Sequence, residues 1–411
     1  MFHITWKRLA WILGLAAGLV MVVMTVWTVI AGPITVFRII RYGDTDIDDF
    51  THYPGRRLQP SETPFMFEES EDAFEIPPSV LADYGDEGDL GQFLEANNSI
   101  AFLVIRDDVI LYERYFQGHS ASSLSQLFSV SKSFTSVLVG TAIDDGYIES
   151  DEQAITDFVP ELQEAGFASV KIHHLLTMMS GSSYVESDNP FGEHVIFNYT
   201  PRLRSRILES EMKETPGEVF RYKSGDNALL ALALDRALGG ETITEYTQRR
   251  VWEPLGMEHK GVWSLDHADD GLEKTWCCLA ASARDIAKIG RLYLQEGVWE
   301  DQQILSSDWI ARSTQAQVPG AAWPGRYEDV GWSNYGYHWW LASEAEGDVF
   351  ALGKDGQFLY LHPGRDLIIV RLGWSTGNLG SSEWIALFQR IALRISESRS
   401  RRRLPTKFQH F

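Results

Sequence analysis

Ser129 and Lys132 stand three residues apart at the start of a segment with helical spacing, where a hydroxyl and an amine share one helix face. The positive end of the helix dipole would stabilise a developing alkoxide on Ser129, and a neutral Lys132 would accept the hydroxyl proton. Burial can lower the pKa of a lysine, about 10.4 in water, by as much as about 3–5 units. The pair therefore predicts a serine nucleophile that is activated without histidine. The alternative is a surface lysine, because a chain of this length holds about one Ser-x-x-Lys quartet by chance.

Two further segments carry groups that suit the same chemistry. Tyr222 and Ser224 lie between a turn and a helix expected from about Asp226. A tyrosine on such a loop can act as acid or base when a cation lowers the pKa of its phenol. Residues 353–357 enter a strand with two glycines, so that a backbone N–H there could join the N–H of Ser129 as an oxyanion hole. The alternatives are aromatic packing for Tyr222 and a plain strand-entry turn for the glycines.

The hydrophobic periodicity predicts the elements that position these residues. β-type patterns occur at residues 100–106, 109–116, 349–352, 357–361 and 367–372. Helical spacing occurs from Ser129 to Gly146, at residues 173–179, 227–238, 242–251 and 282–295, and in a last helix from Ser381 or Ser382. Strands near both ends with helices between them predict an α/β (α+β) fold. We expect one antiparallel sheet that is built from both ends of the domain and flanked by helices, with a mainly helical insertion.

The N-terminus predicts a membrane anchor. Residues 9–37 carry no charge, and residues 11–31 are apolar apart from glycine and threonine. A bilayer core requires about 20 such residues, and the core of a cleavable signal is shorter, roughly 7–15 residues. We expect a transmembrane signal-anchor at 1–37, a proline- and acid-rich connector at 38–85, a catalytic domain at 86–398 outside the cytoplasm, and a basic tail at 399–411. Cleavage after Ala31 stays open.

Charge, cysteine and histidine content exclude other classes. The net charge of −21 argues against a nucleic-acid partner, which requires a basic face. Cys277 and Cys278 are the only cysteines, and because neighbouring cysteines rarely bridge, we expect no disulfide. His173, His174 and His194 have no Glu or Cys at a recognisable ligand spacing, so we expect no metal and no cofactor. The oligomeric state stays open.

The Ser129-x-x-Lys132 quartet, the Tyr222-Lys223-Ser224 triplet and residues 353–357, in this order, resemble a known family. It is that of the serine β-lactamases and penicillin-binding proteins, especially the class C β-lactamase-related hydrolases. The resemblance extends over residues 99–393. The triplet together with Gly356-Gln357 is most similar to the esterase and 6-aminohexanoate-dimer hydrolase branch. The resemblance implies a β-lactamase-like fold and an acyl-enzyme mechanism.

The resemblance also implies residue roles. Ser129 is the expected nucleophile, Lys132 its proton-relay partner, and Tyr222 the acid or base at the leaving group. The backbone N–H groups of Ser129 and Gln357 are the expected oxyanion hole. The expected substrate-binding residues are Ser224, Lys354 and Gly356.

Two departures from the class C pattern favour small esters or amides over β-lactams. Ser224 stands where class C β-lactamases have an asparagine, and Asp355 replaces the threonine of Lys-Thr-Gly. The aspartate places negative charge where a β-lactam carboxylate would bind. The sequence therefore predicts a membrane-anchored serine hydrolase of small esters or amides. The alternatives are penicillin-binding D-Ala peptidase or β-lactamase activity, and a catalytically silent membrane-anchored sensor of the same fold.

Overall fold

The computed structural model describes residues 6–70, 76, 78–84, 88–187, 189–318, 334–343 and 345–402. The helices are α1 (Trp6–Ala31), α2 (Pro33–Tyr42), α3 (Leu90–Ala96), α4 (Val130–Asp144), α5 (Ile172–Leu176), α6 (Glu193–Tyr199), α7 (Leu203–Leu208), α8 (Ser224–Ala237), α9 (Ile243–Thr247), α10 (Ala283–Leu294), α11 (Ser307–Thr314) and α12 (Ser381–Arg402). The strands are β1 (Gly55–Leu58), β2 (Glu68–Glu69), β3 (Ser99–Arg106), β4 (Val109–Tyr115), β5 (Ser125–Gln126), β6 (Gly261–Ser264), β7 (Leu279–Ala281), β8 (Val298–Trp299), β9 (Gln302–Gln303), β10 (Asn334–Tyr335), β11 (Trp340–Ser343), β12 (Asp348–Gly353), β13 (Gln357–His362) and β14 (Leu367–Gly373).

An eight-stranded sheet forms the centre of the domain. Its strand order is β10-β11-β12-β13-β14-β3-β4-β2, and every pair is antiparallel except β2 with β4. Strand β3 pairs with β14, with Val104 opposite Ile369, and so joins the N-terminal hairpin to the C-terminal strands. The prediction of one sheet built from both ends of the domain is confirmed.

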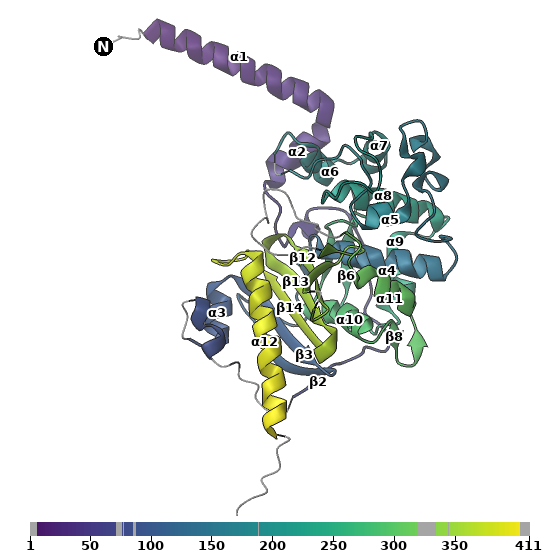
Figure 1. Ribbon diagram of the computed structural model, residues 1–411. Helices are drawn as coiled ribbons and strands as arrows, with labels where there is room; N and C mark the ends of the chain where they lie inside the picture. The colour runs from purple at the N-terminus through teal and green to yellow at the C-terminus, as the bar shows by residue number, and fades with distance from the viewer. Residues whose placement is uncertain are drawn as a thin grey trace, which may run out of the picture.

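The central strands are buried on both faces, because helices cover the sheet on each side. Along β3 the side chains alternate: Leu103 and Ile105 belong to a core that also contains residues of α4 and α10. Phe102 and Val104 belong to a second core, which includes Phe388 of α12. Figure 1 shows α12 lying across one face of the sheet and α10 on the other. The sheet is therefore the middle layer of a three-layer domain.

The mainly helical part contains α5 to α9 and packs beside α4. As the sequence predicted, α4 is buried on nearly all sides, from Val130 to Ala142. Helix α8 packs against α4, α5 and α7. It begins at Ser224, two residues earlier than predicted, so Ser224 lies in the first helical turn.

The sequence did not predict helices α2, α3, α6, α7 and α11 or the strand pairing of the connector. Asp89 caps α3, with its carboxylate accepting from the backbone N–H groups of Gly91 and Gln92. The connector contributes β1, which pairs with β6 in a second, four-stranded sheet, and β2, which pairs with β4. The last helix begins at Ser381 as expected. The acidic residues 71–75 and 85–87, and the tail from residue 403, lie outside the described residues.

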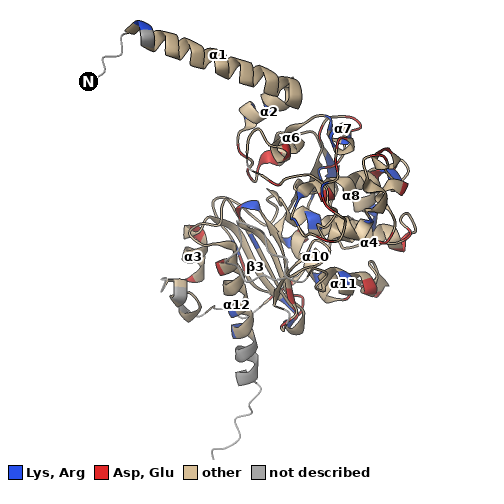
Figure 2. Ribbon diagram, turned by 45° about the horizontal axis from the view of Figure 1, so that its top comes forward, with Lys and Arg blue, Asp and Glu red and all other residues tan. Residues whose placement is uncertain are grey.

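Helix α1 projects from the domain and carries no charged residue after its first turn (Figure 2). Its segment Leu9–Ala31 is 23 residues long and apolar enough to cross a membrane, a property that anchors share with signal sequences. At its C-terminal end, Trp27 and Ala31 pack with Val36 of α2 and Ile196 of α6.

The expectation that Cys277 and Cys278 do not bridge is wrong, because the two form a disulfide. Their Cα atoms are 3.7 Å apart, below the usual range for bridged cysteines, which is why adjacency argued against a bond. The chain turns sharply at this point: the backbone N–H groups of both cysteines donate to the carbonyl of Lys274. This turn brings the two side chains together.

Candidate active site

Ser129 is the N-cap of α4 and keeps access to solvent. From Ser125 to Ala142 every residue except Ser129 is buried. Phe128, directly before it, has a φ of 47°, in the left-handed region that non-glycine residues rarely adopt. The turn at Phe128 thus delivers one hydroxyl to the surface of an otherwise buried helix start.

Lys132 lies one turn further along α4 and is 1% exposed. Its Nζ donates to Ser129 Oγ at 2.8 Å and to the backbone carbonyl of Trp276 at 2.9 Å. Burial lowers the pKa of Lys132 to about 8, against the opposing effect of the Glu186 charge. At neutral pH about a tenth of the lysine is then the free amine, which can take the Ser129 proton.

Tyr222 lies beside this pair and its side chain is largely buried. The Lys132 Nζ is 5.0 Å from the centroid of the Tyr222 ring. On its other side the ring stacks on Trp340, with centroids 5.8 Å apart and planes 17° from parallel. Tyr335 contacts its edge, with centroids 6.2 Å apart. The structure therefore brings together all three of the residues predicted to be catalytic.

Ser224 is near the site, but its contacts differ from the expected ones. Its backbone N–H and its hydroxyl both donate to the Glu186 carboxylate, at 2.6 and 2.8 Å. The Ser187-Asp188-Asn189 triplet matches another signature of the family. Of this triplet the structure describes Ser187 and Asn189, and the backbone N–H of Asn189 donates to Ser187 Oγ.

The hairpin of β12 and β13 approaches Ser129 through Gly353. A Cβ on Gly353 would lie 2.3 Å from the Leu127 carbonyl oxygen and 3.2 Å from the Phe128 Cβ, so this close approach requires glycine. Gln357 is opposite Gly353 in the strand register, and its side-chain amide donates to the Gly373 carbonyl.

Gly356 and Lys354 are directed to other partners. Gly356 has a φ of 77° and lies against the Arg371 guanidinium, where a Cβ would clash. The Lys354 Nζ binds Asp44 Oδ1 at 2.8 Å and both oxygens of Thr45, in the connector. These contacts place the Lys354 amine on the connector.

Glu186 lies at the site but was not predicted from the sequence. Its carboxylate lies in an irregular loop without hydrophobic periodicity, so no pattern marked it. Burial raises the pKa of this carboxyl, but the His194 imidazole, the Lys132 charge and the Ser224 backbone N–H together hold it down at about 2. A charged and largely buried carboxylate therefore lies near Lys132.

Among the described residues no group of three or more His, Cys, Asp or Glu side chains could hold a metal ion. A serine hydroxyl at a helix start, a buried lysine one turn on and a tyrosine beside the lysine are the arrangement of a serine hydrolase of the β-lactamase type. Comparison with known proteins agrees: the Beta-lactamase family model matches residues 90–389, and the chain belongs to this family.

Relatives lie on several branches of that family. The 6-aminohexanoate-dimer hydrolase of Paenarthrobacter ureafaciens is 27% identical over 325 residues, which are 75% of this chain and 81% of that protein. Penicillin-binding protein 4 of Amycolatopsis lactamdurans is 22% identical over 303 residues, 66% of this chain and 77% of that protein. The solved structure of a putative 6-aminohexanoate-dimer hydrolase from Bacillus anthracis has a TM-score of 0.73 at 22% identity, covering 85% of this chain and 94% of its own.

Proposed function

We propose that this protein is a membrane-anchored serine hydrolase that cleaves small ester or amide bonds through an acyl-enzyme on Ser129. The observation that carries the proposal is the 2.8 Å hydrogen bond from Lys132 Nζ to the solvent-accessible Ser129 Oγ. The names of the relatives add support for amide substrates, because two of them are described as acting on the 6-aminohexanoate dimer.

The mechanism follows from the geometry. Neutral Lys132 takes the Ser129 proton as Oγ attacks the substrate carbonyl, and the resulting lysinium returns that proton toward the leaving group through Tyr222. The leaving alcohol or amine departs, and water, activated by the same groups in reverse, releases the acid. The Trp276 carbonyl keeps the Lys132 amine directed at Oγ in both steps.

The oxyanion hole combines the Ser129 N–H with an N–H of the β12–β13 hairpin, for which the sequence suggested Gln357. The close contact of Gly353 with the turn before Ser129 makes the next amide, that of Lys354, a second candidate. One such donor is worth about 2.7–4 kcal/mol of transition-state stabilisation.

Covalent labelling tests the nucleophile. A fluorophosphonate should add its mass to the peptide that carries Ser129 in the detergent-solubilised full-length protein. The variant Ser129→Ala is the control, and equal labelling of that variant would refute the assignment.

A panel of p-nitrophenyl esters, linear amides, D-Ala-D-Ala peptides and nitrocefin then ranks the activities by kcat/KM. Stable labelling with no turnover of any member would instead support a silent sensor.

Membrane attachment and topology have their own test. In this proposal the apolar segment Leu9–Ala31 of α1 is the anchor, and the catalytic domain lies on the extracytoplasmic side. Protein made in cells should stay with the membrane after a carbonate wash, and protease added from outside should digest the domain. Release of the domain by the wash, with an N-terminus at residue 32, would show that the segment is a cleaved signal.

A further inference from the structure

The Glu186 carboxylate is held by groups from two helices. Ser224, in the first turn of α8, donates its backbone N–H to Glu186 Oε2 at 2.6 Å and its hydroxyl to Oε1 at 2.8 Å. On α6, the His194 Nδ1 lies 3.5 Å from Oε2. The Glu186 side chain is 15% exposed, and both of its oxygen atoms accept hydrogen bonds from Ser224. Hydrogen bonds to a charged group in such a setting are strong.

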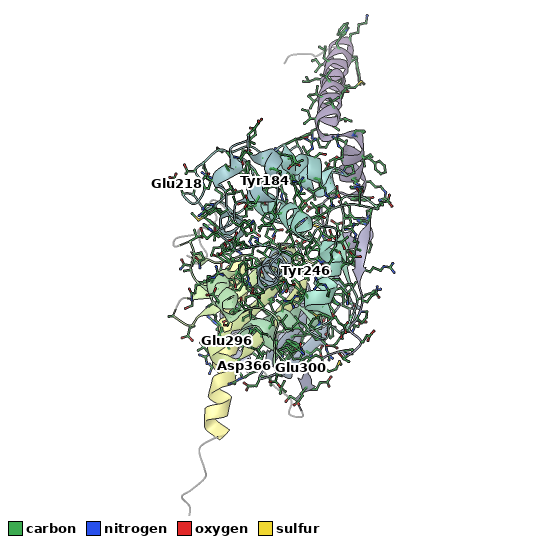
Figure 3. The ribbon with its side chains drawn as sticks, turned by 90° about the vertical axis from the view of Figure 1, so that its right-hand side faces the viewer. Tyr184, Glu218, Tyr246, Glu296, Glu300 and Asp366 are labelled. Carbon is green, nitrogen blue, oxygen red and sulfur yellow. A yellow bond between two sulfur atoms is a disulfide. The ribbon has the colours of Figure 1, made fainter. Side chains whose placement is uncertain are left out.

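Hydrogen bonds through Asn198 connect His194 with Trp276, and they determine the tautomer of His194. The Trp276 indole N–H donates to Asn198 Oδ1 at 2.9 Å, which directs the Asn198 Nδ2 toward His194 Nε2, 3.2 Å away. His194 Nε2 therefore accepts, and Nδ1 carries the proton that faces Glu186 and the Tyr184 hydroxyl, 2.8 Å away. The backbone carbonyl of the same Trp276 accepts from Lys132, so one residue contacts both Asn198 and the lysine. Figure 3 labels Tyr184 in the upper, helical part of the molecule.

The titratable groups that face Lys132 come from three places in the fold. They are Glu186 in the loop before α6, Tyr222 directly before α8, and His338 between β10 and β11, while His194 on α6 acts on Glu186. Burial and the nearby Lys132 charge keep the pKa of His338 well below its usual value, so this ring is neutral. Glu186 is the negative charge that acts on Lys132, and it opposes the effect of burial.

We propose that Glu186 is a positioning residue for the acylation step: its negative charge sets the fraction of neutral Lys132, and its two oxygens fix Ser224, while His194 holds it in the ionised form. The inference rests on the proposed function, because it concerns the proton relay to Ser129. Glu186 acts through Lys132 and Ser224 and takes no part in bond making.

Glu186→Gln separates charge from geometry. The glutamine oxygen can accept from the Ser224 N–H and its amide can donate to the Ser224 hydroxyl, so the local bonds are kept while the charge is lost. Without that charge Lys132 loses its proton more readily. The rate of Ser129 labelling by a fluorophosphonate should therefore rise with pH at a midpoint about one pH unit below that of the wild type, whose midpoint is about 8.

Two further variants isolate the cause. Glu186→Asp keeps the charge but is too short to reach Ser224 as before, so its midpoint should stay near that of the wild type while the plateau rate falls. The matched control is Glu152→Gln, which removes the charge of a second Glu–His pair, with His173 Nδ1 at 3.0 Å from an exposed Glu152. Its pH profile should equal that of the wild type.

The outcomes are distinguishable. Wild-type protein that labels at Ser129, together with an unshifted Glu186→Gln midpoint, overturns this inference and leaves the proposed function intact. An equal shift in Glu186→Asp and Glu186→Gln also overturns it, because the charge is then not the cause. Wild-type protein that never labels at Ser129 overturns the proposed function and this inference together. If Glu186→Gln does not fold, Glu186→Ala, which also removes the charge, takes its place, and an unshifted midpoint in that variant overturns the inference.

Discussion

Two buried lysines in this molecule have nearly the same surroundings. Lys132 donates to the Trp276 carbonyl and lies 5.0 Å from the ring centroid of Tyr222. Lys274 donates to the Asn198 carbonyl at 2.6 Å and lies 3.5 Å from the ring centroid of Tyr53. Burial lowers both pKa values, to about 8 and about 7.

The two lysines differ in whether the amine is hydrogen-bonded to a serine hydroxyl. Lys132 donates to Ser129 Oγ, whereas the Lys274 amine faces a ring and a carbonyl beside the connector, with the Arg38 charge lowering its pKa further. Lys274, whose pKa departs further from the usual value, is thus the lysine that has no hydrogen bond to a serine hydroxyl. A shifted pKa marks a buried charge, and only the geometry shows which buried charge can do chemistry.

The pair of variants Lys132→Met and Lys274→Met would break this comparison most directly. Methionine fills the space of each lysine without an amine. Lys132→Met should lower kcat/KM by about 10²–10⁴-fold, the usual contribution of a general base, while Lys274→Met should keep the activity within a few-fold of the wild type. The measurement is kcat/KM on the best ester of the panel, with thermal melts to confirm folding. Equal losses in two folded variants would show that Lys274 belongs to the relay.

The pH dependence of stability sharpens the same comparison. A lysine whose folded pKa is depressed binds fewer protons in the folded than in the unfolded state between the two pKa values. Its contribution to stability is complete above about pH 10.4 and is lost as pH falls to the folded pKa, at about 1.4 kcal/mol per unit. The window reaches down to about 7 for Lys274 and about 8 for Lys132.

Lys274→Met should therefore gain stability relative to the wild type, by roughly 4 kcal/mol at most, between pH 10 and pH 7. Lys132→Met should show a smaller gain that is complete by about pH 8. Urea unfolding at several pH values measures both differences. A difference that does not change with pH would mean that the lysine is charged and solvated in the folded state as it is in the unfolded state.

The sequence predicted the elements whose periodicity is unbroken. Helix α4, strands β3 and β4, strands β12 to β14 and the start of α12 all carry continuous apolar patterns, and all are found. The Ser-x-x-Lys quartet could be placed because both groups lie on one helix, where three residues bring side chains together. Tyr222 required the family resemblance, since nothing local distinguishes it from a packed aromatic.

Contacts made by long-range folding could not be predicted. Glu186 reaches Ser224 across 38 residues, from a loop that has no pattern. Lys354 was expected to bind substrate, but it is within reach of Asp44 only because the connector folds back over 310 residues. The Cys277–Cys278 bridge depends on a local turn that propensities of the two cysteines do not encode.

The Cys277–Cys278 bridge lies in the segment 274–278, which contains Lys274 and the Trp276 carbonyl that binds Lys132. Removing the bridge tests whether it keeps this segment in place. It follows directly on Trp276, whose carbonyl positions Lys132. Replacing both cysteines by serine should weaken the hydrogen bond between the Trp276 carbonyl and Lys132. We expect kcat/KM to fall by about 2–10-fold, the range for weakening one hydrogen bond. Thiol titration of the denatured wild type should find two thiols only after reduction. Two thiols without reductant would show that the bridge is absent.

Lys354 offers the smallest effect and a third environment for a lysine. Its amine is partly exposed and pairs with the exposed Asp44, so the pair should contribute about 0–1 kcal/mol to stability. If the connector contact is its main role, Lys354→Ala and Asp44→Ala should change KM and kcat equally, by less than about 5-fold.

If Lys354 leaves Asp44 to bind a substrate carboxylate, the two variants diverge. Lys354→Ala then raises KM for carboxylate-bearing substrates, while Asp44→Ala lowers it by freeing the amine. KM for a matched pair of substrates, with and without a carboxylate, distinguishes the two roles.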